Sequence, residues 1–402
     1  MNINRNYLNL TLILFGIGFV LTFSSLYILN TYLGKNLYLG ELPELLANDF
    51  TRVYYFTKHG LSYDYVRNYF PSEPLPYGSL TLIIFKIFSF LPIQISVILF
   101  YFIFIVGLLA IHYTLIKNSN YTKLNKIFAI ITLSFASCPV IYILDRGNFD
   151  MLIYVTLVYA VLNYDKGKTK TFVTLISTVA ASKFFPVVFG LLLLRDKKWK
   201  MILLATVITI FLFFAPFFLF QNDFFYNLKG FLFEIKDSKR YFNLMNISFS
   251  YTFKKIIFLF VSKDELSIHW KTFYLYYNVF IILLGIALSF IITFSKRIQK
   301  WEIISLISLY AVLFPHMSAG YKLMIALIPM YYMLQEKSTL ELNIIVPVYV
   351  FSISLIPAFI NLLAKGFHVW IALTVFFTII FFYLLLKHIF IHLFFYVRSK
   401  NN

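Results

Sequence analysis

Apolar runs of about 15–25 residues recur from one end of this chain to the other, with short polar stretches between them. A helix of about 20 apolar residues spans the hydrocarbon core of a bilayer and satisfies its own backbone hydrogen bonds there. The runs lie at 8–29, 77–91, 93–116, 126–144, 149–163, 170–194, 200–220, 273–294, 301–314, 319–334, 341–363 and 368–396. They predict an all-α polytopic membrane protein with a bundle of about 10–13 transmembrane helices, in which residues 1–402 form one integral membrane domain.

The composition excludes the main alternatives to a membrane protein. Hydrophobic residues make up 60% of the chain and charged residues only 13%, whereas a soluble domain carries roughly 25% charged residues. Too few charges remain to cover a water-exposed surface, and a chain this apolar is not intrinsically disordered. The apolar runs are continuous rather than alternating, which disfavours an outer-membrane barrel. The single cysteine, Cys138, allows no internal disulfide.

Basic residues outnumber acidic residues by 35 to 17, which gives a net charge of +18. In a membrane protein this excess marks the short cytoplasmic loops and also attracts anionic lipids, so we expect membrane lipids, and no nucleic acid, as partners. The basic loops are 117–126, 164–170, 195–200 and 295–300. The long loops 31–76 and 221–272 then face the other side, which predicts a bacterial inner (plasma) membrane protein with its site facing the periplasm or exterior.

Two apolar segments are expected to depart from simple crossings. Segment 77–91 is short for a crossing and would otherwise put the next basic loop outside, so we expect a partial or re-entrant element there. Segment 170–194 is interrupted at 182–186, which predicts a hairpin of two half-length helices. Aromatic residues in 31–76 predict short helices lying on the membrane surface, and 251–262 predicts another.

Five short polar clusters fall on the predicted exterior side: Asn48-Asp49-Phe50, Asp145–Asp150, Ser182–Pro186, Asn246–Ser248 and Pro315–Lys322. Ionisable groups at membrane depth are costly and are functional candidates. Each also has a structural explanation. Asp145 and Arg146 suit helix-end charges, Lys183 a snorkelling lysine, and His316 a hydrogen-bonded core histidine. The convergence of five clusters on one face favours a shared site.

These side chains suit an anionic, lipid-linked substrate. Arg146 and Lys183 are phosphate ligands by type, and Asp49 suits a general base acting on a sugar hydroxyl. The role of base is also open to four other carboxylates, Asp150, Asp145, Asp64 and Glu41. The sequence contains no zinc-ligand spacing, phosphate-binding glycine loop, dinucleotide fingerprint or Gly-x-Ser-x-Gly elbow. An exterior site also argues against a nucleotide-sugar donor, which is cytoplasmic.

Several short motifs follow one another in the order Leu75-Pro76-Tyr77, Leu91-Pro92, Arg146-Gly147-Asn148, Lys183-x-x-Pro186, Arg195–Lys200, Asn246-x-Ser248 and Pro315-His316. This order resembles the GT-C superfamily of integral membrane glycosyltransferases, most closely glycosyltransferase family 87, the polyprenol-phosphate-mannose-dependent mannosyltransferases. The Arg-Gly-Asn and lysine–proline elements are also similar to those of the mannosyltransferase of glycosylphosphatidylinositol assembly. The resemblance extends from residue 1 to about residue 335.

The resemblance implies roles for individual positions. Asp49 matches the early acidic residue that is expected to be the catalytic base. The positions expected to bind the donor phosphate are Arg146, Asn148, Lys183 and His316, the histidine being open to the acceptor as well. The other positions expected to bind substrate are Asp150, Asn246, Ser248 and Lys322.

The sequence departs from the family pattern in two places. Pro76-Tyr77-Gly78 stands where Tyr-Pro-Pro is usual, and the first long loop lacks the paired acidic motif of some GT-C enzymes. We therefore expect no metal and no other cofactor.

The implied activity is transfer of a sugar, with mannose expected, from a polyprenyl-phosphate donor to a lipid-linked or glycan acceptor on the exterior face, by inverting displacement. Two alternatives stay open. A flippase or transporter for lipid-linked saccharides is disfavoured because no internal repeat is visible. An O-antigen-type polymerase would need paired arginines in two exterior loops, and that alternative is left open by Arg52, Arg67, Arg146 and Arg240.

Overall fold

The computed structural model describes residues 3–33, 48–61, 77–241, 248–257, 263–295, 298–315, 320–354 and 367–400. Within these ranges the chain forms helices joined by turns and contains no strand, so the predicted all-α class is confirmed. The first half of the chain contains α1 (Arg5–Leu33), α2 (Asn48–His59), α4 (Ser79–Phe88), α5 (Ile93–Ile116), α6 (Lys123–Phe135), α7 (Cys138–Arg146), α8 (Asp150–Asp165), α9 (Thr169–Ser182), η1 (Phe185–Gly190) and α10 (Leu191–Arg195). The second half contains α11 (Trp199–Phe214), η2 (Ala215–Leu219), α12 (Phe224–Tyr241), α13 (Phe249–Ile257), α14 (Lys263–Phe294), α15 (Lys300–Leu313), η3 (Gly320–Ala326), α16 (Leu327–Met333), α17 (Leu340–Ser354) and α19 (Phe367–Lys400).

Four helical stretches in the described part of the chain are long and apolar enough to cross a bilayer: Ile93–Ile116, Trp199–Leu219, Leu275–Phe294 and Leu373–Ile391. Their outer faces are apolar; on α11, Leu203, Val207 and Phe211 are exposed at 67%, 55% and 66%. Residues four apart lie on one side of a helix, so these three form a stripe. An exposed apolar stripe of this kind is unfavourable in water but favourable in contact with lipid chains, as expected of a polytopic membrane protein.

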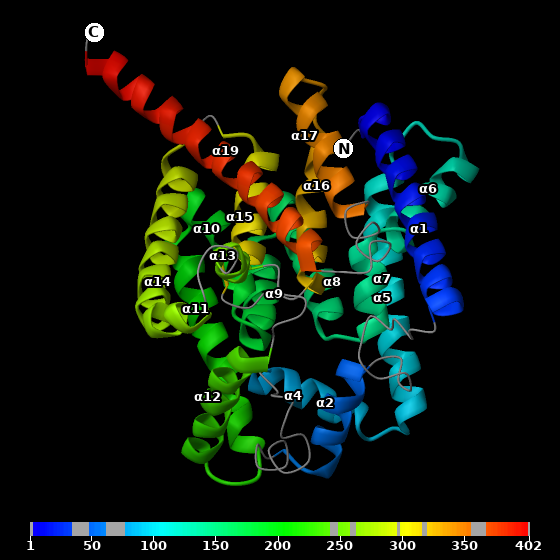
Figure 1. The fold of residues 1–402 in the computed structure, drawn as a ribbon, viewed down its shortest axis with the longest axis vertical. Helices are drawn as coiled ribbons and strands as arrows, with labels where there is room; N and C mark the ends of the chain where they lie inside the picture. Colours follow the sequence, from blue (N-terminus) through cyan, green and yellow to red (C-terminus); the bar gives the residue numbers. More distant parts are fainter. Residues whose placement is uncertain are drawn as a thin grey trace.

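α2 of the first long loop and α12 of the second lie at the same end of the bundle (Figure 1), whereas α13, also in the second long loop, packs on α19 away from that end. α2, α4 and α12 gather at the lower end in this view, where α4 packs on α2 and η2, and η2 packs on α12. α6, which follows the basic loop 117–126, lies at the upper end. α2 and α12 therefore lie at the opposite end of the bundle from α6.

Two apolar segments differ from plain crossings. α4 has 10 residues and is about 15 Å long, too short for a hydrocarbon core of roughly 30 Å. This length agrees with the partial element expected for 77–91. Segment 126–144, expected as one apolar element, consists of two helices, α6 and α7. Pro139 lies in the first turn of α7, where proline is favoured because no N–H is needed, so it marks the start of a new helix.

The break predicted within 170–194 is present. α9 ends at Ser182, Lys183 has an extended backbone (φ −148°, ψ 138°), and η1 begins at Phe185. Pro186 lies in the first turn of η1, a position where proline is favoured because no N–H is needed. α9 and η1 pack against each other, so Lys183 lies at the turn between two short helices.

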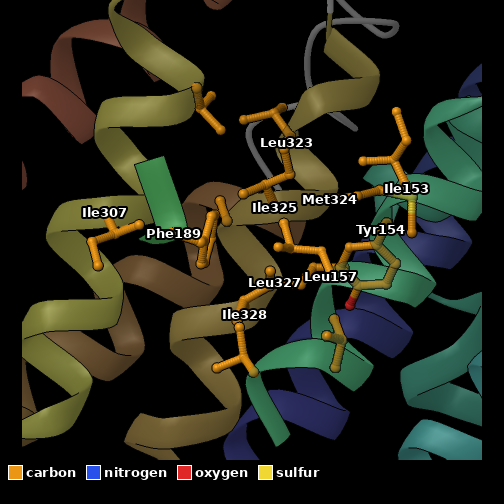
Figure 2. Close-up of a cluster of buried hydrophobic side chains, with 14 of the residues drawn as sticks. Ile153, Tyr154, Leu157, Phe189, Ile307, Leu323, Met324, Ile325, Leu327 and Ile328 are labelled. Carbon is orange, nitrogen blue, oxygen red and sulfur yellow. The ribbon is translucent and has the colours of Figure 1, made fainter. Parts of the chain in front are cut away.

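A buried apolar core holds these elements together (Figure 2). Leu157 of α8, Phe189 of η1 and Ile307 of α15 are fully buried, and side chains of η3 and α16 fill the space between them. This packing fixes the first residue of α8, the residue that follows α9 and the third residue of η3 relative to one another. The core thereby brings together three charged side chains, Asp150, Lys183 and Lys322.

Candidate functional site

The turn between α7 and α8 presents three polar side chains within five residues. α7 ends at Arg146, and Gly147 caps it in the left-handed conformation (φ 60°, ψ 34°), where its N–H donates to the Ile143 carbonyl at 3.0 Å. Asn148 Oδ1 then accepts the backbone N–H of Asp150 at 3.0 Å. This side-chain turn starts α8, and a residue with a Cβ at position 147 would be strained.

Asp49 joins α2 to this turn through both of its carboxylate oxygens. Oδ1 lies 3.0 Å from Nη2 of Arg146, and Oδ2 accepts a hydrogen bond from Nδ2 of Asn148 at 2.6 Å. Asp49 is only 8% exposed. α2 begins at Asn48, so Asp49 lies inside the first turn rather than at the capping position. Its carboxylate bridges two elements, whereas a simple helix cap would bond to the backbone of its own helix.

An aromatic cluster anchors α2 beside the turn. Phe50 is fully buried, and its ring centroid lies 4.9 Å from Phe100, 5.1 Å from Phe85 and 5.8 Å from Phe88. Phe85 in turn lies 5.6 Å from Phe149, which directly follows Asn148. Phe50, which follows Asp49, and Phe149, which follows Asn148, thus both pack against Phe85. This shared packing holds Asp49 close to Asn148.

Tyr77 contacts both Asn148, which binds Asp49, and Lys183 at the end of α9. Its hydroxyl oxygen accepts a hydrogen bond from Nδ2 of Asn148 at 3.2 Å, and its ring centroid lies 4.8 Å from Nζ of Lys183. Burial raises the pKa of the Tyr77 phenol well above its ordinary value, and the charges of Asp49 and Asp150 raise it further. The phenol therefore stays neutral, and its ring face is available to the ammonium as a cation–π partner.

Gly78 explains why this chain departs from Tyr-Pro-Pro. Its N–H donates to the carbonyl oxygen of Ser182 at 3.2 Å, which satisfies a carbonyl at the end of α9. A Cβ at position 78 would lie 2.5 Å from the carbonyl oxygen of Ala181. The backbone at residue 78 lies so close to α9 that glycine is required there. A proline at position 78 would also remove the N–H that donates to Ser182.

Lys183 forms the second ion pair of the site. Its Nζ lies 2.7 Å from Oδ1 of Asp150, and the two side chains are only 14% and 5% exposed. Lys322 lies nearby on η3, with Nζ 5.1 Å from the ring centroid of Phe185 and within electrostatic range of both Asp150 and Lys183.

The polar side chains of the cluster are Asp49, Tyr77, Arg146, Asn148, Asp150, Lys183 and Lys322. Three cations lie beside two carboxylates in this cluster. Guanidinium and ammonium groups of this kind bind phosphate.

The predicted site residues have different outcomes. Six of them meet in the cluster: Asp49, Arg146, Asn148, Asp150, Lys183 and Lys322. Ser248 instead accepts the N–H of Tyr251 at 3.3 Å at the start of α13, which is the contact of a helix cap. The structure does not describe the side chains of five other candidates, Glu41, Asp64, Asp145, Asn246 and His316. Their predicted roles stay predictions.

Tyr77 was not predicted as a site residue, although it stands in the unusual Pro-Tyr-Gly sequence. That departure was the available signal, since glycine lets another segment of backbone approach closely. Among the described residues, no group of three His, Cys, Asp or Glu side chains comes together to bind a metal ion.

The model of glycosyltransferase family 87 matches residues 76–318, more than half of the chain. The chain belongs to glycosyltransferase family 87. Family 87 enzymes are GT-C-type membrane glycosyltransferases, so this protein is a transferase, and the transporter alternative is wrong. The matched segment contains Tyr77, Arg146 and Lys183, whereas Asp49 and Lys322 lie beyond its ends. A comparison with curated proteins finds no significant match.

Proposed function

We propose that this family 87 enzyme transfers a sugar, with mannose expected, from a polyprenyl-phosphate donor to a glycan or glycolipid acceptor. The reaction takes place at the exterior face of the bacterial inner membrane. The proposal rests on the meeting of two buried ion pairs, Arg146–Asp49 and Lys183–Asp150, where α2, α7, α8 and α9 converge. Such a site offers a carboxylate for a hydroxyl proton and cations for a phosphate within one cluster.

The reaction is a single displacement with inversion at the anomeric carbon. The acceptor oxygen forms a bond to that carbon while the bond from the carbon to the phosphate oxygen breaks. Asp49 takes the hydroxyl proton, and the bonding electron pair leaves with the polyprenyl phosphate. Lys183 and Lys322 stabilise the charge that develops on this leaving group. No metal ion is needed for this balance.

Arg146 controls when Asp49 becomes available. Without donor, its guanidinium holds one carboxylate oxygen of Asp49. A phosphate competes for the same guanidinium, because both anions accept its paired N–H groups. Donor binding then releases that oxygen for the acceptor hydroxyl, while Asn148 continues to orient the other oxygen. Asp150 is the second candidate for the base, held in a similar way by Lys183.

The test is an assay of the purified protein in lipid nanodiscs. The donor is polyprenyl-phosphate mannose, and the acceptors are a panel of glycans and glycolipids. We expect sugar transfer, release of polyprenyl phosphate, and a product with the opposite anomeric configuration by NMR. Transfer from a nucleotide sugar without any lipid donor would contradict the proposal, and so would retention of configuration. Asp49→Asn is the control for enzyme-dependent transfer.

A further inference from the structure

A cavity of about 210 Å³ lies where the start of α1 meets the turn between α5 and α6. The residues that form its wall are Ile3, Arg5, Leu8, Asn118, Ser119, Asn120 and Tyr121. The N-terminus and α6 lie in the upper part of Figure 1, whereas α2 and α4 of the charged cluster lie at the lower end. The cavity is therefore separate from the site that contains Asp49 and Lys183.

Both walls of the cavity are held in place by hydrogen bonds. The N–H of Asn4 donates to the carbonyl of Leu334 at 2.7 Å, which fixes the start of α1 against the end of α16. The ammonium group of Lys126 donates to the carbonyl of Lys117 at 2.7 Å, which closes the turn between α5 and α6. The Tyr121 hydroxyl donates to the side chain of Asn9, which joins this turn to α1. The cavity is thus formed before a ligand enters it, as in most small-molecule sites.

The polar groups in the wall are mostly hydrogen-bond donors that suit a phosphate. Arg5 provides a guanidinium, whose central carbon lies 5.7 Å from the ring centroid of Tyr121. Asn118 and Asn120 provide amide N–H groups. Oγ of Ser119 is buried and has no hydrogen-bond partner among the residues that the structure describes, an unfavourable state that a phosphate oxygen would relieve. None of the seven lining residues is acidic.

The sequence around the cavity is basic and contains no compensating carboxylate. Residues 1–40 and 74–144 include no Asp or Glu, whereas Lys117, Lys123 and Lys126 accompany Arg5. Arg5 is also the first residue of α1, and the N-terminus of a helix carries a partial positive charge. Basic loops mark the cytoplasmic side of a membrane protein, where anionic lipids attract clustered Lys and Arg. Charge therefore favours an anion at this cavity.

The two helices beside the cavity also present apolar surface to the membrane. Ile13 and Ile17 are exposed on α1 and follow Arg5 at multiples of four residues, so they lie on the same side of the helix. Leu124 and Phe128 are exposed on α6 and lie four residues apart. α1 and α6 pack side by side. A cationic cavity next to two exposed apolar faces matches the phosphate and the acyl chains of a phospholipid.

We propose that this cavity binds the phosphate group of an anionic phospholipid, such as phosphatidylglycerol, whose acyl chains lie along α1 and α6. The lipid comes from the leaflet opposite to the one that serves the charged cluster, so it is neither donor nor acceptor. Its phosphate connects α1 to the turn between α5 and α6 and stabilises their packing. A free phosphate has the same charge but no chains to cover the apolar faces, which favours the lipid as the occupant.

The first test measures the Kd of phosphatidylglycerol for the protein in detergent by native mass spectrometry. Arg5→Gln should raise this Kd about tenfold, the size expected for loss of one charge-assisted contact. Lys166→Gln is the matched control, because Lys166 is an exposed residue of the next basic loop and does not line the cavity. It removes the same charge from the same side of the membrane and should leave the Kd unchanged. An equal rise in both variants would show general attraction to a basic surface and would overturn the proposal.

A thermal measurement compares ligands and does not depend on Arg5. Phosphatidylglycerol should raise the Tm of the wild type, since a ligand that binds the folded state stabilises it. Zwitterionic phosphatidylcholine and inorganic phosphate should not. Asn118→Asp places a carboxylate in the wall at an exposed position and should abolish the rise if Arg5→Gln folds poorly. An equal rise with phosphatidylcholine would contradict recognition of the anion, and an equal rise with inorganic phosphate would contradict the lipid.

Discussion

Oδ1 of Asp49 lies 3.0 Å from Nη2 of Arg146, although 97 residues separate the two in the sequence. The pair connects the first turn of α2 with the end of α7, and both side chains are largely buried. A buried pair of this kind is costly to break by removing one partner, because the other charge is left uncompensated. An incoming phosphate can instead replace the carboxylate as the partner of Arg146. The Arg146–Asp49 pair would then orient both side chains in the absence of donor and separate when the donor binds.

Replacing the carboxylate of Asp49 by an amide should separate chemistry from binding. Asp49→Asn keeps the size of the side chain and one acceptor oxygen but cannot take a proton. We expect turnover to fall by about 10²–10⁴-fold, as for loss of a general base, with donor affinity largely retained. Single-turnover kinetics and donor binding measure the two effects. Asp150→Asn is the comparison: if it abolishes turnover while Asp49→Asn turns over normally, Asp150 is the base.

Removing Lys183 should weaken donor binding. Lys183→Ala deletes a cation that is only 14% exposed and leaves Asp150 without its 2.7 Å partner. A charge-assisted contact of this kind contributes about 1.5–3 kcal/mol, so we expect Kd for the lipid phosphate to rise about 10–100-fold. Lys183→Arg should restore little, because a guanidinium is larger and planar, whereas the Lys183 ammonium occupies a site that leaves its side chain only 14% exposed. Unchanged affinity in Lys183→Ala and in Arg146→Ala would reject the phosphate assignment.

Some parts of the structure could be predicted because they depend on local sequence. α5 has the bounds expected from its apolar run, Ile93–Ile116. The break after Ser182 follows from Pro186, which favours the first turn of a new helix, and from the charged Lys183 before it. Six of the expected site residues also meet, because polar groups at the ends of apolar helices have few other places to lie.

Other parts could not be predicted, because they depend on contacts between distant segments. Nothing in the composition of α2 indicates that Asp49 pairs with Arg146 rather than Lys183. The place of Tyr77 between the two ion pairs follows from the packing of residue 78 on α9, which is a tertiary contact. The break between α6 and α7 was missed since Pro139 was counted within an apolar run, although proline favours the first turn of a new helix.

The close approach at Gly78 gives a stability prediction. Gly78→Ala places a methyl group 2.5 Å from the carbonyl oxygen of Ala181, so α4 and α9 must move apart. We expect a loss of about 1–3 kcal/mol, as for overpacking of a tight contact, seen as a lower Tm in detergent. Gly16→Ala adds the same methyl group in open space within α1 and should leave Tm unchanged or raise it slightly. Equal Tm values for the two variants would show that the backbone adapts at Gly78.

Cysteine labelling should test which end of the bundle faces outward. In a Cys138→Ser background, Phe225→Cys places a thiol at an exposed position of α12, and Asn118→Cys places one at an exposed position of the basic loop 117–126. Because basic loops stay in the cytoplasm, an impermeant maleimide should label position 225 in spheroplasts and position 118 only after lysis. The reverse pattern would invert the proposed orientation, and labelling of both in intact spheroplasts would reject the topology.

Tyr77 should act through its ring more than through its hydroxyl. Tyr77→Phe keeps the ring that lies 4.8 Å from Nζ of Lys183 but removes the acceptor for Nδ2 of Asn148. Asn148 retains its 2.6 Å bond to Asp49, so we expect donor affinity within about threefold of wild type, a net loss on the order of one neutral hydrogen bond.

Tyr77→Leu removes the ring as well and leaves the Lys183 ammonium without its aromatic partner. We expect this variant to lose a further 1–2 kcal/mol or so of donor binding, the range of a desolvated cation–π contact. A double-mutant cycle with Lys183→Met isolates the effect: the cost of Tyr77→Leu should largely vanish when the ammonium is absent. If Tyr77→Phe and Tyr77→Leu weaken binding equally, the hydroxyl is the group that matters, and Tyr77 acts by orienting Asn148 instead.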